Sequence, residues 1–107
     1  MASRRTIIEL SERPFNADAI AAAFHQDSEE AGAIVTFLGQ VSREDDTDPV
    51  ISLHLDHMPD ATLASIERIA DAAEARWPLL KACIIHRVGI VLRGEPIVFV
   101  GCAARHR

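Results

Sequence analysis

Five stretches of the chain have the hydrophobic patterns that predict β-strands. Residues 6–10 (TIIEL) form a short apolar run, and residues 32–41 (GAIVTFLGQV) form a longer one rich in β-branched side chains. Residues 50–57 alternate between apolar and polar positions, which predicts a strand with one solvated face. Residues 82–88 (ACIIHRV) and 97–104 (IVFVGCAA) are again apolar and complete the set.

A first amphipathic helix is predicted between the first two strands. Asn16 is a good N-cap, and Asp18 lies in the first turn, where its charge complements the helix dipole. The helix is predicted to end near Gln26. The side chains that it is expected to bury are Ile20, Ala23 and Phe24.

The second helix is the clearest element of the sequence. Asp60 is its predicted N-cap, and the helix covers residues 61–76 before Pro78 disfavours helical geometry at Trp77. The order β-α-β-β-α-β-β predicts an α+β fold in which both helices pack on a mixed or antiparallel sheet. A chain of this length forms one domain, residues 1–107. The apolar stripe of the second helix consists of Leu63, Ile66, Ile69, Ala70 and Ala73.

The last predicted strand needs cover on both sides. Residues 97–104 are apolar on both faces, and the sequence ends three residues later at Arg105-His106-Arg107. Each large apolar side chain left uncovered forfeits roughly 1.5–3 kcal/mol. We therefore expect either further chain or a partner on this face, and we favour further chain.

Composition and charge exclude several classes of function. The net charge of −5 argues against a general nucleic-acid binder, whose affinity depends on lysines and arginines that neutralise phosphates. No apolar run is long enough to cross a membrane, and no apolar segment follows the basic start to make a signal peptide. Cys83 and Cys102 lie in strand-like runs, which predicts free buried thiols and a cytoplasmic protein.

Two positively charged segments could bind an anion. Arg43 follows the central strand beside Gln40 and Ser42, where it could grip a phosphate or carboxylate, or else pair in solvent with the acidic residues that follow it. Arg105, His106 and Arg107 could bind an anion and move a proton near neutral pH, or form a frayed charged terminus. The residues alone leave both alternatives open at both places.

The remaining candidates have simpler explanations. His54 and Asp56 share one face of their predicted strand while His57 points to the other, so polar positions on an exposed face explain them better than a metal site. His86 lies in an apolar run and is predicted to be semi-buried, with its ring nitrogens hydrogen-bonded. Trp77, at the end of the second helix, is predicted to be a core residue. From the residues alone we predict a soluble α+β domain with an indication of an anion site.

Three groups of residues together resemble a known family. Residues 32–41 resemble its "G-A-x-V-x-F-x-G-x-V-R" strand and loop. Residues 53–59 (LHLDHMP) and 75–79 (ARWPL) resemble its "L-x-L-E-H-Y-P" and "A-R-x-R-W-P" elements. The segments IHRVG, GEPIVFV and RHR, from residue 85 to the end, resemble "I-H-R-x-G", "G-D-x-I-V-x-V" and "x-H-R". In this order and spacing the chain resembles the MoaE family, the large subunits of molybdopterin synthase.

The resemblance implies an α/β hammerhead-type fold, a homodimer of large subunits, and a small ubiquitin-like sulfur-carrier subunit bound to each. The carrier's C-terminal glycine thiocarboxylate would deliver two sulfurs to cyclic pyranopterin monophosphate, forming molybdopterin without any further cofactor. It also implies that His106 and Arg107 are the catalytic pair of the substrate pocket. The strand-end loop would bind substrate through Gln40, Val41, Ser42 and Arg43.

Two departures from the family pattern stand out. Ser42 occupies the position of the family arginine, and Arg43 comes one residue late, which on a regular strand would reverse its face. The family continues into a helix and a "K-x-R-x-P-x-W-K" stretch whose lysines take part in acyl transfer, whereas Lys81 is the only lysine here. We therefore expect a C-terminally truncated chain that is inactive alone. The alternatives are a non-catalytic carrier-binding or dimerisation module, and a small metal-dependent hydrolase.

Overall fold

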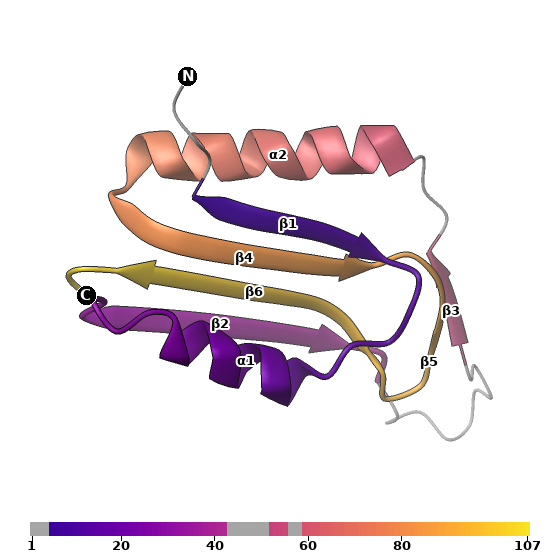
Figure 1. Cartoon of the computed structure of the whole chain (residues 1–107). Coiled ribbons are helices and arrows are strands. Elements are labelled where there is room, and N and C mark those ends of the chain that lie inside the picture. Colours follow the sequence, from indigo (N-terminus) through magenta and orange to yellow (C-terminus); the bar gives the residue numbers. More distant parts are fainter. Residues whose placement is uncertain (1–4, 43–51, 56–58) are drawn as a thin grey trace.

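The computed structural model describes residues 5–42, 52–55 and 59–107, without the side chains of residues 52–55 and 59 (Figure 1). Polar loops separate the apolar runs, so the elements follow the hydrophobic pattern closely. In chain order they are β1 (Thr6–Ser11), α1 (Ala17–Gln26), β2 (Ala33–Gln40), β3 (Ser52–Leu55), α2 (Pro59–Arg76), β4 (Leu79–Arg87), β5 (Gly89–Leu92) and β6 (Pro96–Ala104).

Four of the strands form a mixed sheet in the order β1-β4-β6-β2. β1 runs parallel to β4, whereas β6 is antiparallel to both of its neighbours, β4 and β2. β3 and β5 form a separate antiparallel pair. The predicted α+β class with a mixed sheet and two helices is confirmed.

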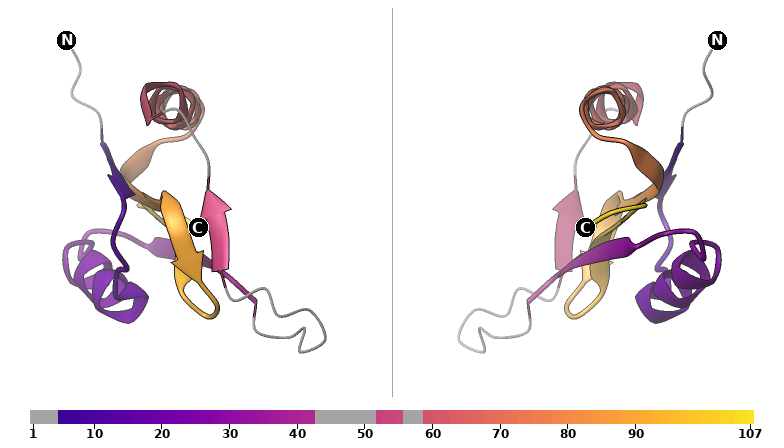
Figure 2. Two further views of the ribbon diagram at one scale, coloured as in Figure 1. Left: turned by 90° about the vertical axis from the view of Figure 1, so that its right-hand side faces the viewer. Right: turned by 90° about the vertical axis from the view of Figure 1, so that its left-hand side faces the viewer.

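The two helices pack on opposite faces of the four-stranded sheet. On one face the Phe24 ring of α1 lies so close to Gly101 of β6 that an added Cβ would meet ring atoms at 3.2 Å. On the other face Thr6 donates a hydrogen bond to Glu74 of α2. Thr6 is level across the strands with Cys102, the neighbour of Gly101, and successive strand residues point to opposite faces. Figure 2 shows α2 beside β1 and α1 beside β2 and β6.

The core is small and follows the central strands. Phe99 of β6 is 2% exposed, and Val91 of β5 is fully buried. Phe24 is buried as predicted. Ala23, the residue before it, was also expected to be buried, but it lies on the solvent side of α1 and is exposed. Ile69 is 66% exposed although it belongs to the predicted stripe of α2, because that helix packs mainly along β1 at the edge of the sheet. The other buried apolar side chains are Ala70, Ala82, Ile85, Val88 and Ala103.

Three boundaries differ from the prediction. Asp60 lies in the first turn of α2 and is not its cap, because the helix already begins at Pro59. β4 begins at Leu79 instead of residue 82. The sequence analysis missed β5, which follows β4 after a sharp change of direction at Gly89, whose φ of 78° favours glycine. β5 is short and has no long apolar run, so its pattern alone does not reveal it.

Candidate functional site

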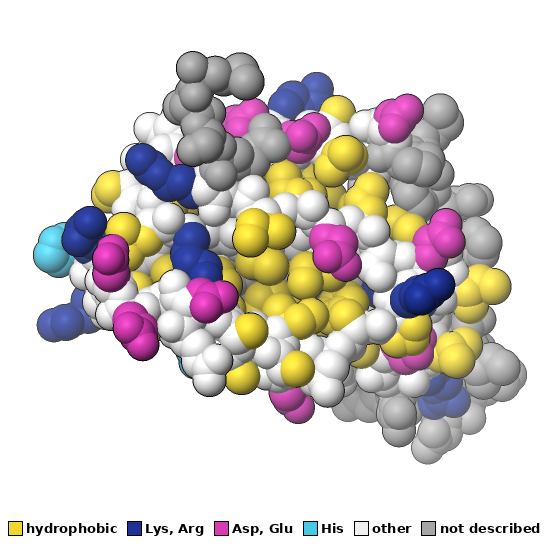
Figure 3. Space-filling view, in the orientation of Figure 1, with side chains coloured by type: hydrophobic (Ala, Val, Ile, Leu, Met, Phe, Trp, Pro, Cys, Tyr) yellow, Lys and Arg dark blue, Asp and Glu magenta, His cyan; other side chains and the backbone are white. Residues whose placement is uncertain are grey.

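A surface hollow of about 640 Å³ lies at the end of the sheet where β4 begins and β6 ends. Its floor is apolar and its rim carries positive side chains. Figure 3 shows Lys or Arg and His side chains together at the end of the molecule where Figure 1 marks the C-terminus. The lining residues are Arg5, Trp77, Pro78, Leu79, Leu80, Ala104, Arg105, His106 and Arg107.

The positive rim is formed largely by the three residues that follow β6. Arg105, His106 and Arg107 are all exposed. Their side chains make no hydrogen bond or ion pair with any residue that the structure describes, so their donors are available to a ligand. Two guanidinium groups beside an imidazole suit a phosphate or a carboxylate, since arginine binds both in bidentate fashion.

Gly32 holds the backbone of this segment from the side. Its N–H donates to the carbonyl of Ala104 at 2.9 Å, and a Cβ at position 32 would collide with the carbonyl oxygen of Arg105. A smaller hollow of about 340 Å³ opens here, lined by Gly32 and the three terminal residues. The sequence analysis read Gly32 only as part of a family motif. Its position directly before an apolar strand was the available signal for a close backbone approach.

Arg5 reaches the hollow from the start of β1. Its backbone N–H donates to the Glu74 carboxylate at 3.2 Å, and its Nη1 donates to the carbonyl of Leu79 at 3.3 Å. Thr6 donates to the same carboxylate at 2.7 Å. The Thr6 hydrogen bond, followed by that of the Arg5 backbone, lowers the pKa of Glu74 below its ordinary value. Glu74 therefore stays ionised and fixes the residue that carries this third guanidinium group.

Trp77 lines the hollow and is not the core residue that its sequence context suggested. Its side chain is 53% exposed, because α2 ends at Arg76 and the chain turns directly into β4. The Arg76 guanidinium lies 5.0 Å from the centroid of the Trp77 ring, which is a cation–π distance. The hollow therefore contains a flat aromatic surface next to cationic side chains.

The second group of predicted site residues lies at the other end of the sheet. Ala33, at the start of β2, pairs with Ala104, whereas Gln40, at its end, pairs with Pro96. Seven residue steps at about 3.3 Å each separate Gln40 from the hollow by about 20–25 Å. Within one chain the structure therefore does not bring Gln40, Val41 and Ser42 together with residues 105–107. Arg43 lies outside the described residues.

Val41 is tied to the turn between β5 and β6. Its N–H donates to the carbonyl of Glu95 at 3.0 Å, and its own carbonyl accepts from the N–H of Gly94 at 2.7 Å. Gly94 has a φ of 79°, a conformation that favours glycine. The backbone entering the predicted substrate loop is therefore fixed by a turn that is distant in sequence.

No metal centre emerges from the part of the chain that the structure describes. Within those residues no group of three His, Cys, Asp or Glu side chains could hold a metal ion. The side chain of His54 is not described, and Asp56 and His57 lie outside the described residues. His86 is half-buried, with Nδ1 2.6 Å from the carbonyl oxygen of Arg87, as expected for a satisfied histidine. Within the same residues, no helix is long and apolar enough to cross a membrane.

The two cysteines are free, as predicted, but they are half-buried and not fully buried. Cys83 pairs with Gly101, the residue before Cys102, so the two thiols point to opposite faces of the sheet. Burial raises the pKa of both thiols above the ordinary value. Both therefore remain protonated at neutral pH and are poor nucleophiles.

Comparison with known sequences gives one consistent result. The sequence profile of the family described as "MoaE protein" matches residues 10–107. The molybdopterin synthase catalytic subunit of Vibrio cholerae serotype O1 is 46% identical over 78 residues, which are 73% of this chain and 52% of that protein. The subunit of the same name from Pasteurella multocida is 39% identical over 100 residues, 94% of this chain and 66% of that protein. The chain thus spans about half to two thirds of these relatives' length.

Solved structures agree with the fold. A molybdopterin biosynthesis MoaE protein from Burkholderia ambifaria superposes with a TM-score of 0.78 at 34% identity, covering 95% of this chain and 66% of that one. A complex of subunits 1 and 2 of molybdopterin-converting factor from Helicobacter pylori contains a chain with a TM-score of 0.77 at 18% identity, covering 94% of this chain and 66% of that one. At that identity the second likeness supports the fold alone.

Proposed function

The chain belongs to the MoaE protein family, and from this premise we propose that it is a sulfur-transferring catalytic subunit in molybdenum cofactor biosynthesis. Its substrate would be cyclic pyranopterin monophosphate, and the sulfur donor would be the thiocarboxylated C-terminus of a small ubiquitin-like carrier subunit. The product would be the dithiolene of molybdopterin. The reaction would take place in the cytoplasm, where thiols such as Cys83 and Cys102 stay reduced.

One observation carries this proposal: the hollow combines unpaired cationic side chains with an apolar, aromatic floor. The substrate has the matching chemistry, because it joins a phosphate to a flat ring system. Arg105 and Arg107 would bind the phosphate or the carrier's terminal anion through charge-assisted hydrogen bonds. Trp77 offers a surface on which the ring can stack.

The chemistry requires anion stabilisation and a proton carrier. In each transfer the thiocarboxylate sulfur forms a bond to a carbon of the substrate while a carbon–oxygen bond at that carbon breaks, so that the oxygen leaves as water or as the opened phosphate ester, and the carrier stays joined to the product as a thioester. Water then cleaves the acyl–sulfur bond and releases the carrier with an ordinary carboxylate. His106 would move the proton, and the neighbouring arginines would stabilise the negative charge that develops on oxygen.

A homodimer would unite the two groups of predicted site residues. β2 is the last of the described strands in its sheet, and Val35 and Phe37 on it are 68% and 58% exposed. If the β2 strands of two copies pair antiparallel, the Gln40–Ser42 end of one copy lies beside Gly32 of the other. The second copy's terminal Arg105–Arg107 segment is then about two strand spacings away, about 10 Å.

The test is reconstitution with the thiocarboxylated carrier and cyclic pyranopterin monophosphate, followed by detection of molybdopterin. We expect conversion once the chain is extended with the lysine-bearing C-terminal segment of a relative, and in this extended chain we expect Arg107→Ala to reduce kcat/KM by about 10–100-fold, the range for a lost charged hydrogen bond. Arg13→Ala serves as the control, because Arg13 is exposed and does not line the hollow. Absence of conversion by the extended chain would contradict catalysis.

A second candidate function is a carrier-binding module without turnover. Lys81, the only lysine of the sequence, has its Nζ 4.0 Å from Asp27 and 4.6 Å from the centroid of the Phe24 ring, so it does not line the hollow. The hollow therefore has no amine to take part in acyl transfer. Calorimetry with the carrier separates the candidates: tight binding without conversion supports the module, and absence of binding contradicts both.

A further inference from the structure

Arg87 is a charged side chain in the most buried part of the molecule. It is the last residue of β4, and only 2% of it is exposed. Burying a guanidinium is costly unless its donors are satisfied. Its Nε has no hydrogen-bond partner among the described residues, so the cost is only partly offset. An apolar side chain would fill this position with less cost, so packing alone does not explain an arginine here.

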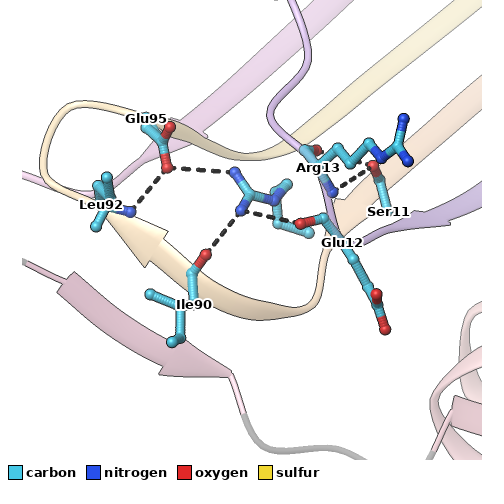
Figure 4. A network of polar contacts seen from close by, with 7 residues as sticks. Ser11, Glu12, Arg13, Ile90, Leu92 and Glu95 are labelled. Carbon is cyan, nitrogen blue, oxygen red and sulfur yellow. Dashed lines mark hydrogen bonds and ion pairs between the residues drawn. The ribbon is translucent and has the colours of Figure 1, made fainter.

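The remaining donors of Arg87 connect three separate segments. Nη1 donates to the Glu95 carboxylate at 3.4 Å, and Nη2 donates to the carbonyl of Ile90 at 2.7 Å. Nη2 also reaches the carbonyl of Glu12, after β1, at 3.5 Å. Figure 4 shows these oxygens of Glu95, Ile90 and Glu12 converging on one guanidinium. The rigid fork of arginine suits this three-way connection, whereas lysine has no such fixed geometry.

Glu95 carries the connection into the turn between β5 and β6. The same Oε1 that receives Arg87 also accepts the backbone N–H of Leu92 at 2.8 Å. The backbone N–H of Glu95 donates to the carbonyl of Leu92 at 3.0 Å, which closes the turn. Residues 92–95 are therefore held both by their own backbone and by the buried guanidinium.

The turn between β5 and β6 also fixes the residues at the end of β2. Val41 exchanges two backbone hydrogen bonds with it, one with the Glu95 carbonyl and one with the Gly94 N–H, at 3.0 and 2.7 Å. Glu95 thus contacts both partners: its carboxylate accepts from the guanidinium, and its carbonyl accepts from Val41. Ser42 follows Val41 directly, so these contacts end at the loop that the proposed reaction needs.

We propose that Arg87 is a positioning residue that acts through Glu95 to fix the Gln40–Ser42 exit of β2 as a substrate-binding segment. The positioning itself rests only on the contacts described above. Its consequence for substrate binding rests on the proposed function. Arg87 is buried and does not line the hollow, so it need not touch the substrate.

Amide hydrogen exchange of the full-length chain tests the positioning. In Arg87→Lys, which keeps the charge and loses the fork, we expect protection of the Val41 amide to fall at least about tenfold. Amides of the central strand β6, such as Phe99 and Val100, should change much less. Arg13→Lys, an exposed arginine after β1, should change neither set. The proposal is overturned if Val41 keeps its protection, or if Val41 and β6 lose it equally.

Glu95→Gln provides a second variant in case Arg87→Lys fails to fold. The amide oxygen of glutamine can still accept from Leu92 and Arg87, so only the charge is lost. We expect a smaller decrease of Val41 protection in the same pattern, and an unchanged Val41 amide would count against the proposal.

A kinetic measurement tests the functional consequence. In the reconstituted reaction we expect Glu95→Gln to raise KM for the pterin severalfold with little change in kcat, because the loop binds the substrate and does not react with it. A decrease confined to kcat would contradict the positioning role. If the extended chain gives no conversion, the proposed function fails, while the exchange experiment still decides the positioning.

Discussion

The arginines at the two ends of the sheet serve opposite purposes. Arg87, near the turn between β5 and β6, is 2% exposed and directs its terminal nitrogens at oxygens of the protein itself. Arg105 and Arg107, after β6, are exposed and bond to no described residue. The comparison teaches that an arginine side chain supports the fold where its donors are used internally, and that its donors are available to a ligand where they are not.

Removing the buried arginine should have the largest effect. Arg87→Met is expected to lower the free energy of unfolding by about 3 kcal/mol, because it leaves Glu95, whose side chain is only 25% exposed, without its partner. Arg105→Met should stay within about 0.5 kcal/mol of the unaltered chain, as surface substitutions do. Urea unfolding followed by circular dichroism measures both.

The double variant Arg87→Met/Glu95→Leu sharpens the same comparison. Replacing both charges should recover part of the lost stability, because no uncompensated carboxylate then remains. Equal losses in Arg87→Met and Arg105→Met would show that the two ends do not differ in the way described.

Two glycines, one directly before β2 and one near its end, allow a test with an effect of intermediate size. Gly32→Ala should cost about 1–3 kcal/mol and shift the backbone amide signals of residues 105–107, because the added Cβ meets the rigid carbonyl of Arg105. Gly39→Ala, at the other end of β2, meets side chains alone, Val98 at 3.0 Å and the Phe37 ring at 3.7 Å, and these can adjust. Thermal unfolding and NMR spectra of both variants check the difference. Similar spectra for residues 105–107 in both would contradict the role given to Gly32.

Protonation of Glu74, beside the hollow, should produce the smallest effect. The pKa of Glu74 is lowered in the folded chain, so its contribution to stability is present above the carboxyl's ordinary value and is lost as the pH falls through the lowered value. In Glu74→Gln this acid-dependent loss should be absent. NMR titration of the Thr6 amide below pH 5 compares the two proteins, and an identical acid response would contradict the assignment.

Much of the fold could be predicted because local residue patterns determine it. The cap at Asn16, which accepts the N–H of Ala19, and the burial of Phe24 follow directly from neighbouring residues. β5 escaped prediction because its four residues have too short a pattern, and the change of direction at Gly89 depends on the backbone alone. The exposure of Trp77 escaped because it depends on where β4 turns away from α2.

The candidate site was predictable in its residues but not in its arrangement. The resemblance pointed to His106 and Arg107, and both line the hollow. It also joined them to Gln40 and Ser42, whereas the antiparallel pairing of β2 with β6 places these at the far end of the same chain. Strand pairing is a long-range property that no local pattern encodes, and the contributions of Arg5 and Gly32 depend on the same long-range contacts.

The uncovered strand β2 also bears on how the protein behaves in a cell. Its eight residues carry no charge and no proline, the two devices with which natural sheets commonly discourage unwanted strand addition. Chains in which β2 stays unpaired would therefore offer a template for aggregation. The cell would then need either to limit the synthesis of this chain or to degrade unpaired copies promptly.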